Sequence, residues 1–275
     1  MLSKRALCIQ NMQENEHIFA CPICSQHVRV GNEGSVVCTS KHSFDIAKQG
    51  YINFITKPVQ SMYSKELFEA RHDIISSGLY DELQTLLAKL AVGTHLLDTG
   101  CGEGSHLARI AAKKSGAIGV GIDIAKEGIV AAAKFHPGFI WCVGDLAKSP
   151  YNEESFDTIF NILSPANYDE FRRLLKPEGK VIKVVPHEGY LKELRQQAFA
   201  NSEKESYSNE QTVVRFQESF SKVEVERLTY TKQLPQELVP KLLAMTPMGW
   251  HIEKKSEIVL TEITVDVMIL TGRSE

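Results

Sequence analysis

The sequence lacks any long apolar run. Nowhere in its 275 residues do 18 or more consecutive apolar residues occur, which is the length that a membrane-spanning helix needs. The first segment, 1–17, has a basic pair but no apolar stretch behind it, so it does not resemble a secretory signal. We therefore expect a cytoplasmic protein.

The chain also lacks a strong charge of either sign. Its formal net charge is −3, which argues against broad, sequence-independent adhesion to nucleic acid. The distribution is uneven, because residues 1–60 carry +2 and the remainder carries −5. A local RNA contact through a small N-terminal module is compatible with this balance.

Cysteine is scarce, yet half of the cysteines are clustered. The six are Cys8, Cys21, Cys24, Cys38, Cys101 and Cys142. In a reducing compartment, clustered cysteines are more often metal ligands than disulfides. We interpret Cys101 and Cys142, which are scattered, as small buried packing residues.

The order of predicted elements indicates three regions. Residues 1–17 are polar and predict a loose, frayed terminus, whereas 18–57 contain short β-type runs typical of small hairpins. Two helices are expected between 65 and 91, broken at Ser76-Ser77-Gly78. We predict three parts: a small N-terminal module at 1–57, linker helices at 58–92 and a large domain at 93–275.

Strands and helices alternate from residue 94 onward. The predicted strands are 94–98, 117–123, 139–145, 156–163 and 180–186. The predicted helices are 104–114, 125–134, 167–176 and 188–201. Two alternating segments, 223–234 and 258–272, are spaced to finish the sheet as an antiparallel pair with a helix near 236–246 between them. This order predicts an α/β, Rossmann-like fold of the class I methyltransferase type, with a seven-stranded, mostly parallel sheet.

The sharpest motif is LLDTGCGEGSH at 96–106. A hydrophobic strand ends in Asp98, and Gly100, Gly102 and Glu103-Gly104 then turn the chain into a helix. Glycine permits positive φ there and lets a ligand lie against the backbone. Dehydrogenases use a similar turn, but Ser105 stands where their third glycine would be. An acid before the turn suits the cationic ligand S-adenosylmethionine better than a pyrophosphate.

Two further acids end predicted strands. Asp123 can accept hydrogen bonds from the ribose hydroxyls of an adenosyl group, and Asp145 is placed to hold the adenine amino group. The segment LLKPEGK at 174–180 predicts a turn before the fifth strand. Each acid alone could instead cap the following helix.

The N-terminal region has the spacing of a zinc site. Cys21 and Cys24 form a C-x2-C pair, and Cys38 with His42 forms a C-x3-H pair after thirteen intervening residues. Such a Cys3His set leaves no open position, so the zinc should be structural. Free thiols are the competing interpretation, and His17 or His27 could replace His42.

Hairpins closed by zinc often bind nucleic acid through basic and aromatic side chains. The candidates in this module are Lys41, Phe44, Lys48, Tyr51 and Phe54. They could equally form an ordinary solvated rim around a small core.

These segments together resemble the 23S ribosomal RNA guanine-N1-methyltransferase A family, in its Gram-positive branch. The matching stretches are FACPICSQ (19–26), CTSKHSFDIAKQGYINF (38–54), FEARHDIISSGLY (68–80), LLDTGCGEGSH (96–106), GIDIAKEGIVAAAK (121–134) and MTPMGW (245–250). The resemblance implies methylation of a guanine in a hairpin loop of 23S ribosomal RNA by a homodimer with an RNA cleft between its subunits. Some members of the family contribute to macrolide resistance.

The resemblance also assigns site residues. The family's zinc ligands fall on Cys21, Cys24, Cys38 and His42. Its cofactor contacts fall on Tyr80, Gly102, Glu103 and Tyr190, the last of which is histidine in enterobacterial members.

The sequence names no catalytic base. Asn161 or the Ser164 backbone could orient the base edge at the end of the fourth strand, but neither is a good proton acceptor. Trp250 is either a stacking platform for the target base or a buried core residue. Two rival functions remain: a small-molecule methyltransferase with a structural zinc knuckle, and a non-enzymatic RNA-binding factor.

Overall fold

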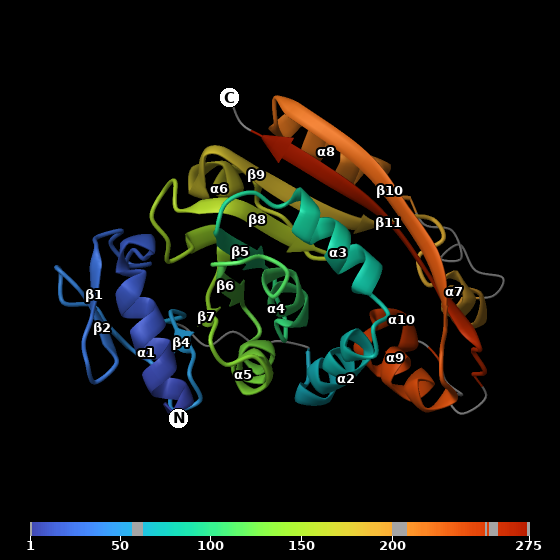
Figure 1. The fold of residues 1–275 in the computed structure, drawn as a ribbon, viewed down its shortest axis with the longest axis horizontal. Helices are drawn as coiled ribbons and strands as arrows, with labels where there is room; N and C mark the ends of the chain where they lie inside the picture. Colours follow the sequence, from blue (N-terminus) through green and yellow to red (C-terminus); the bar gives the residue numbers. More distant parts are fainter. Residues whose placement is uncertain (1, 57–62, 200–207, 251, 253–257, 274–275) are drawn as a thin grey trace.

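In the computed structural model, a twisted sheet of eight strands runs through the molecule (Figure 1). Its strands lie in the order β10-β11-β9-β8-β5-β6-β7-β4. The structure describes residues 2–56, 63–199, 208–250, 252 and 258–273. The strands are β4 (Ile52–Asn53), β5 (His95–Thr99), β6 (Ile118–Asp123), β7 (Ile140–Val143), β8 (Phe156–Ile162), β9 (Leu175–Pro186), β10 (Lys222–Gln233) and β11 (Glu262–Arg273). Neighbours from β4 to β9 pair in parallel, and β11 pairs antiparallel with both β9 and β10.

The predicted mostly parallel sheet is confirmed, and its seven strands are β5 to β11. The eighth strand is β4, which comes from the N-terminal region and pairs with the edge strand β7 through Ile52 and Asn53. A two-residue strand is too short to show a periodicity, so only the tertiary structure reveals this pairing.

Helices cover both faces of the sheet (Figure 1), with α3 in front of it and α6 and α8 behind it. They are α2 (Lys65–Ser76), α3 (Asp81–Leu90), α4 (Ser105–Ala111), α5 (Lys126–Phe135), α6 (Tyr168–Leu174), α7 (Lys192–Ala198), α8 (Glu210–Ser219), α9 (Val239–Met245) and α10 (Pro247–Trp250). The break predicted between α2 and α3 is confirmed at Gly78, where φ is +89°. Helix α8 was not predicted, because Phe216 is its one fully buried residue and the helix otherwise reads as polar.

The turn predicted at 174–180 is wrong in detail. LLKPEGK forms the last residue of α6 and a bulged start of β9, where the register against β8 shifts between Phe156 and Thr158. Glu178 takes a positive φ of +64° within this segment. The change of chain direction that we assigned to a separate turn is made by this bulge within β9.

The predicted frayed terminus is also wrong, because residues Lys4–Glu14 form the helix α1. The side chain of Ser3 caps it by accepting a hydrogen bond from the Ala6 N–H. The helix buries Cys8, Ile9 and Met12, and Asn11 donates to the carbonyl of Gly138 at 2.8 Å. Three buried residues leave the helix polar overall, so its order comes from tertiary packing rather than from a sequence pattern.

A second, three-stranded antiparallel sheet follows α1, as the predicted hairpins require. It consists of β1 (Val28–Val30), β2 (Ser35–Cys38) and β3 (Ser43–Asp45). The rings of Phe44 and Phe54 meet edge-on at 5.2 Å, and their cluster of buried residues continues to Leu97 of β5 and Val120 of β6. The small sheet therefore shares one hydrophobic core with the large sheet.

This shared core shows which of the candidate RNA-contacting residues are accessible. Phe44, Tyr51 and Phe54 are buried, whereas Lys41 and Lys48 are exposed. The three aromatic side chains are therefore core residues, and the suggestion that they contact RNA is wrong.

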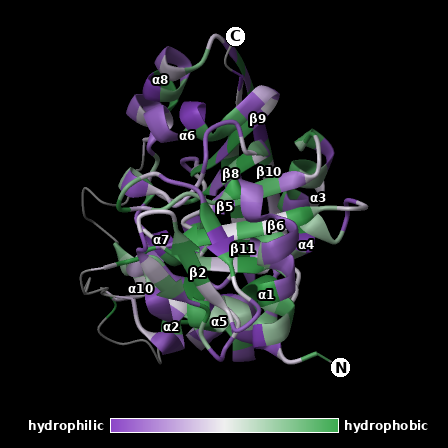
Figure 2. Ribbon diagram, turned by 90° about the vertical axis from the view of Figure 1, so that its left-hand side faces the viewer, coloured by the Kyte–Doolittle hydropathy of each residue, from purple (hydrophilic) through white to green (hydrophobic). Residues whose placement is uncertain are grey.

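Hydropathy follows the layers of the fold. In Figure 2 the strands of the large sheet are mainly hydrophobic, and hydrophilic residues colour much of the helices around them. Within the described ranges, no helix combines the length and the apolarity needed to cross a bilayer.

Candidate functional site

The glycine turn lies at the carboxyl end of β5, at the centre of the sheet. Gly100 has a φ of +72°, and a Cβ there would lie 1.9 Å from Oγ of Ser164. Gly104 has a φ of +79°, and its Cβ would lie 2.3 Å from the ring of Trp141. Both positions exclude a side chain for two independent reasons, so the turn requires glycine.

Asp123, at the end of β6, holds this turn. One carboxylate oxygen accepts the Gly102 N–H at 2.8 Å and the other accepts the Ala125 N–H at 2.8 Å. Burial raises the pKa of Asp123. Asp145 similarly accepts the Ala147 N–H at 2.8 Å and caps a short 3-10 helix. The capping interpretation therefore holds for Asp145, whereas Asp123 binds the loop before α5, and both acids line a cavity.

That first cavity has a volume of about 360 Å³ and lies over the carboxyl ends of β5, β6 and β7. Its walls are largely apolar, with Phe68 and Ile124 among them, and Asp123 and Asp145 are the acids that line it. The segment Leu163–Asn167 forms another wall. Apolar walls with a few polar groups suit the flat ring and the ribose of a nucleoside.

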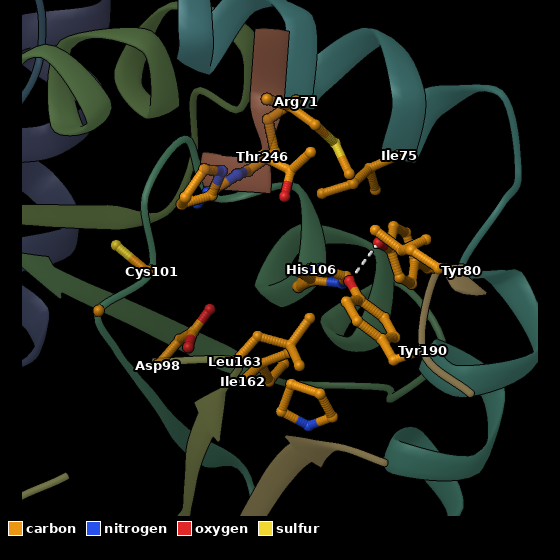
Figure 3. Close-up of a pocket in the computed structure, with 15 residues that line it drawn as sticks. Arg71, Ile75, Tyr80, Asp98, Cys101, His106, Ile162, Leu163, Tyr190 and Thr246 are labelled. Carbon is orange, nitrogen blue, oxygen red and sulfur yellow. Dashed lines mark hydrogen bonds between the residues drawn. The ribbon is translucent and has the colours of Figure 1, made fainter. Parts of the chain in front are cut away.

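A second cavity of about 210 Å³ adjoins the first, because Arg71, Gly100 and Leu163 line both. Figure 3 shows Asp98 at one side of it and Tyr80 and Tyr190 at the other, with their hydroxyl groups 2.7 Å apart. Met245, Thr246 and Pro247 of the MTPMGW segment also line it. The cavity thus joins the glycine turn to two tyrosines that the resemblance named.

Asp98 is the most unusual group in this cavity. Its side chain is 2% exposed, and no described residue donates a hydrogen bond to its Oδ1. Burial raises the pKa of Asp98 to about 8, and the nearby carboxylates of Asp123 and Glu103 add to the shift. An unpaired buried carboxyl of this kind is suited to a cationic ligand.

His106 lies beside the same cavity and is neutral. Burial lowers the pKa of His106 to about 4, and its Nδ1 lies 3.2 Å from Nε2 of Gln84. His106 therefore adds a polar but uncharged wall.

Glu103 and Gly102, which the resemblance named as cofactor contacts, do not line either cavity. The Glu103 carboxylate accepts a hydrogen bond from the Ser105 hydroxyl. His72 Nδ1 and His136 Nε2 lie 3.1 and 3.0 Å from the same hydroxyl. One hydroxyl can donate once and accept twice, so this network satisfies Ser105 and holds the Glu103 side chain away from the cavities.

Arg71 is a candidate that our sequence interpretation missed. It lines both cavities, lies 5.8 Å from the ring of Phe68, and forms no ion pair with any described residue. The segment FEARHDIISSGLY already contained this arginine, but nothing in the local pattern shows that α2 passes over the glycine turn.

The four predicted zinc ligands lie together. Nδ1 of His42 lies 3.5 Å from Cys21 Sγ and 3.4 Å from Cys38 Sγ, and the sulfurs of Cys24 and Cys38 are 3.7 Å apart. Zinc bonds of about 2.3 Å to sulfur and 2.0 Å to nitrogen give tetrahedral edges of about 3.5–3.8 Å. The ligand atoms therefore fit zinc, and His17 and His27 lie outside this group.

The acceptor-side candidates differ in their surroundings. Asn161 is buried, and its amide donates to Thr99 Oγ1 at 3.1 Å and to the Pro165 carbonyl at 2.9 Å. Ser164 lines the larger cavity. Trp250 is 41% exposed and lies against the ring of Tyr63, so the interpretation of a buried core tryptophan is wrong.

Comparison with protein families gives two matches. A family model described as "RlmA, N-terminal", a zinc ribbon, matches residues 19–65. A model described as a methyltransferase domain matches residues 90–239.

Curated relatives match over most of the chain. A Bacillus subtilis protein with the name "Putative 23S rRNA (guanine-N(1)-)-methyltransferase YxjB" is 41% identical, over 93% of this chain and 96% of its own. The Streptomyces fradiae 23S rRNA (guanine(748)-N(1))-methyltransferase is 29% identical, over 84% of this chain and 85% of its own.

A solved structure supports the fold. Phosphoethanolamine N-methyltransferase 2 of Haemonchus contortus, in complex with S-adenosylhomocysteine, superposes with a TM-score of 0.51 at 17% identity. The match covers 78% of this chain and 59% of the other. Both chains thus share the Rossmann-like methyltransferase fold.

Proposed function

Because this chain belongs to the 23S rRNA (guanine-N1)-methyltransferase family, we propose that it methylates N1 of a guanine in a hairpin loop of 23S ribosomal RNA. The methyl donor is S-adenosylmethionine, which supplies a methyl group already activated on a sulfonium. The observation that carries the proposal is the pair of cavities that meet at the glycine turn, with the unpaired carboxyl of Asp98 in the smaller one.

The residues in the cavities match the parts of this donor. In the larger cavity, Asp123 would accept from the ribose hydroxyls and Asp145 from the adenine amino group. In the smaller cavity, Asp98 would pair with the ammonium group, and Arg71 would pair with the carboxylate. The hydroxyl groups of Tyr80 and Tyr190, which line the smaller cavity, would face the same amino-acid end.

The chain's contribution to the reaction is chiefly alignment. A sulfonium methyl group needs no further activation, so the enzyme gains rate by holding acceptor and donor in line and by excluding water. Gly100 lets the donor approach the backbone, and Leu163 lies where the two cavities meet. These groups form the floor of the proposed site.

The N-terminal region would contribute recognition of the RNA. Cys21, Cys24, Cys38 and His42 would hold a structural zinc with no open position. We propose residues 1–57 as the zinc-binding RNA-recognition module, 58–92 as linker helices and 93–275 as the transferase domain. The exposed Lys41 and Lys48 are the basic side chains that this module offers to phosphates.

We further propose a homodimer in which the RNA binds between subunits, as the family resemblance implies. Because ribosomal RNA is the proposed substrate, we also propose that the enzyme acts in the cytoplasm.

The test is transfer of a labelled methyl group to unmodified 23S ribosomal RNA, followed by primer extension to find the modified base. We expect a label on RNA and a stop at a single guanine. Label on a small molecule of a cell extract, with none on RNA, would instead identify a small-molecule methyltransferase. Calorimetry without any S-adenosylmethionine binding would identify a non-enzymatic RNA-binding protein.

A further inference from the structure

Lys183, in the middle of β9, is a buried cation that has no counter-ion among the described residues. Its side chain is 3% exposed, and no carboxylate among the described residues lies within 4.0 Å of its amine. Burying a charge without a partner of opposite sign is costly, so such a group calls for a reason beyond packing. Its amine donates to Oδ1 of Asn161 at 2.5 Å and to the carbonyl of Ser164 at 3.0 Å.

These two bonds leave one N–H of the ammonium group unassigned, because a lysine ammonium has three. Burial lowers the pKa of Lys183 to about 8, so the amine remains mostly protonated at neutral pH. The group can therefore act as a hydrogen-bond donor that carries a positive charge.

Lys183 also lines a third hollow, of about 510 Å³, at the carboxyl ends of β8 and β9. Leu163 lines this hollow and both cofactor cavities, and Pro186 is shared with the smaller cavity. Tyr168 and Arg215 complete its polar walls. The hollow thus adjoins the point where the two cofactor cavities meet.

The loop between the cavities is held in an uncommon conformation. Leu163 has a φ of +52°, which is unfavourable for a side chain with a Cβ. Lys183 and Asn161 bind the two residues that follow it, through the carbonyls of Ser164 and Pro165. The positive charge of Lys183 therefore lies directly beside the strained residue Leu163.

The chemistry of the acceptor suggests why a cation is there. Guanine N1 carries a proton at neutral pH, and loss of this proton spreads negative charge over N1 and O6. A preorganised, positively charged donor near O6 would stabilise that charge.

We propose, on the basis of the proposed function, that the third hollow receives the acceptor guanine and that the Lys183 ammonium donates a hydrogen bond to its O6. The N1 proton passes to solvent water, and N1 then takes up the methyl group with its lone pair. The carbon–sulfur bond of the donor breaks with its electrons on sulfur, leaving a neutral thioether. Lys183 is thereby a catalytic residue that the sequence did not indicate.

The test compares three variants of the full chain on unmodified 23S ribosomal RNA. Lys183→Met removes the charge at similar length, Lys183→Arg keeps it, and Lys180→Met changes another lysine of β9, whose amine donates to the Leu90 carbonyl. Binding of S-adenosylhomocysteine is measured by calorimetry, and kcat and KM are measured separately from about pH 7 to pH 9.

We expect Lys183→Met to lower kcat by roughly 100-fold, the usual effect of losing one donor to a developing oxyanion. Cofactor affinity and KM for RNA should change by less than about threefold. The loss should shrink toward pH 9, because the Lys183 amine is then mostly neutral and hydroxide removes the N1 proton in both enzymes. Lys183→Arg should recover part of the rate, and Lys180→Met should behave as the wild type.

Two results would overturn the inference. A Lys183→Met variant with unchanged kcat would show that the charge does not act on the acceptor. A variant that loses cofactor binding in parallel with turnover would show that Lys183 only supports the loop. Both results require a wild-type enzyme that methylates RNA, and an inactive wild type would instead refute the proposed function itself.

Discussion

The binding of S-adenosylhomocysteine should depend on pH through Asp98. Its carboxyl is buried, no residue in the described part of the chain donates to Oδ1, and burial raises its pKa to about 8, so it is largely protonated at neutral pH. A cationic ammonium group placed beside it favours the ionised form and lowers its pKa in the complex. Binding must therefore release a proton.

The sign and size of the effect follow from linkage. Below the free-state pKa, the ionised fraction of Asp98 rises about tenfold for each pH unit. The affinity should therefore increase roughly tenfold between pH 6 and pH 7, and level off as the pH approaches 8. The same argument predicts the release of about one proton per ligand in that range.

Calorimetry in buffers of different ionisation enthalpy measures both quantities. Asp98→Asn serves as the control, because its amide cannot ionise; its affinity should be lower at pH 7 and independent of pH between 6 and 7. The reasoning is refuted if the wild-type affinity does not change over this range, or if the variant shows the same slope.

Three further changes test other parts of the site. Arg71→Met should weaken S-adenosylhomocysteine roughly 10–100-fold, the effect of losing a charge-assisted bond, yet leave 5′-methylthioadenosine, which lacks the carboxylate, unaffected in calorimetry. Gly104→Ala should lower the unfolding free energy by roughly 2–4 kcal/mol in urea titrations, because of its φ and its contact with Trp141; an unchanged midpoint would contradict this. Cys24→Ser should release zinc and lower the Tm in a single transition, because the two sheets share a core; stoichiometric zinc by metal analysis would exclude our ligand set.

Much of the cofactor half was predictable because its signals are local. The turn needs glycine within a few residues, and Asp98, Asp123 and Asp145 each lie at or just beyond the carboxyl end of a strand. Parallel strands place their carboxyl ends along one edge of the sheet, so the order of elements alone brings these acids together. The zinc ligands were predictable for the same reason, since each pair lies on one short turn.

The orientation of individual side chains was not predictable in this way. Glu103 follows the glycine turn, but Ser105, His72 and His136 draw its carboxylate away from the cavities. His72 and His136 come from α2 and from the end of α5, and no local pattern records such a contact. A motif therefore located the residue without deciding which of its atoms faces the ligand.

The class of fold, the glycine turn and the candidate zinc ligands could be inferred from the amino-acid order, because each depends on periodicity or on spacing over a few residues. The packing of the folded chain was needed to show that α1 is a helix, that Phe44 and Phe54 are core residues, and that Arg71 and Lys183 line the cavities. The physical basis is that the burial of a side chain, and whether it has a counter-ion, depend on residues far away in the chain. The residues next to it in the sequence do not indicate which distant residues it will contact.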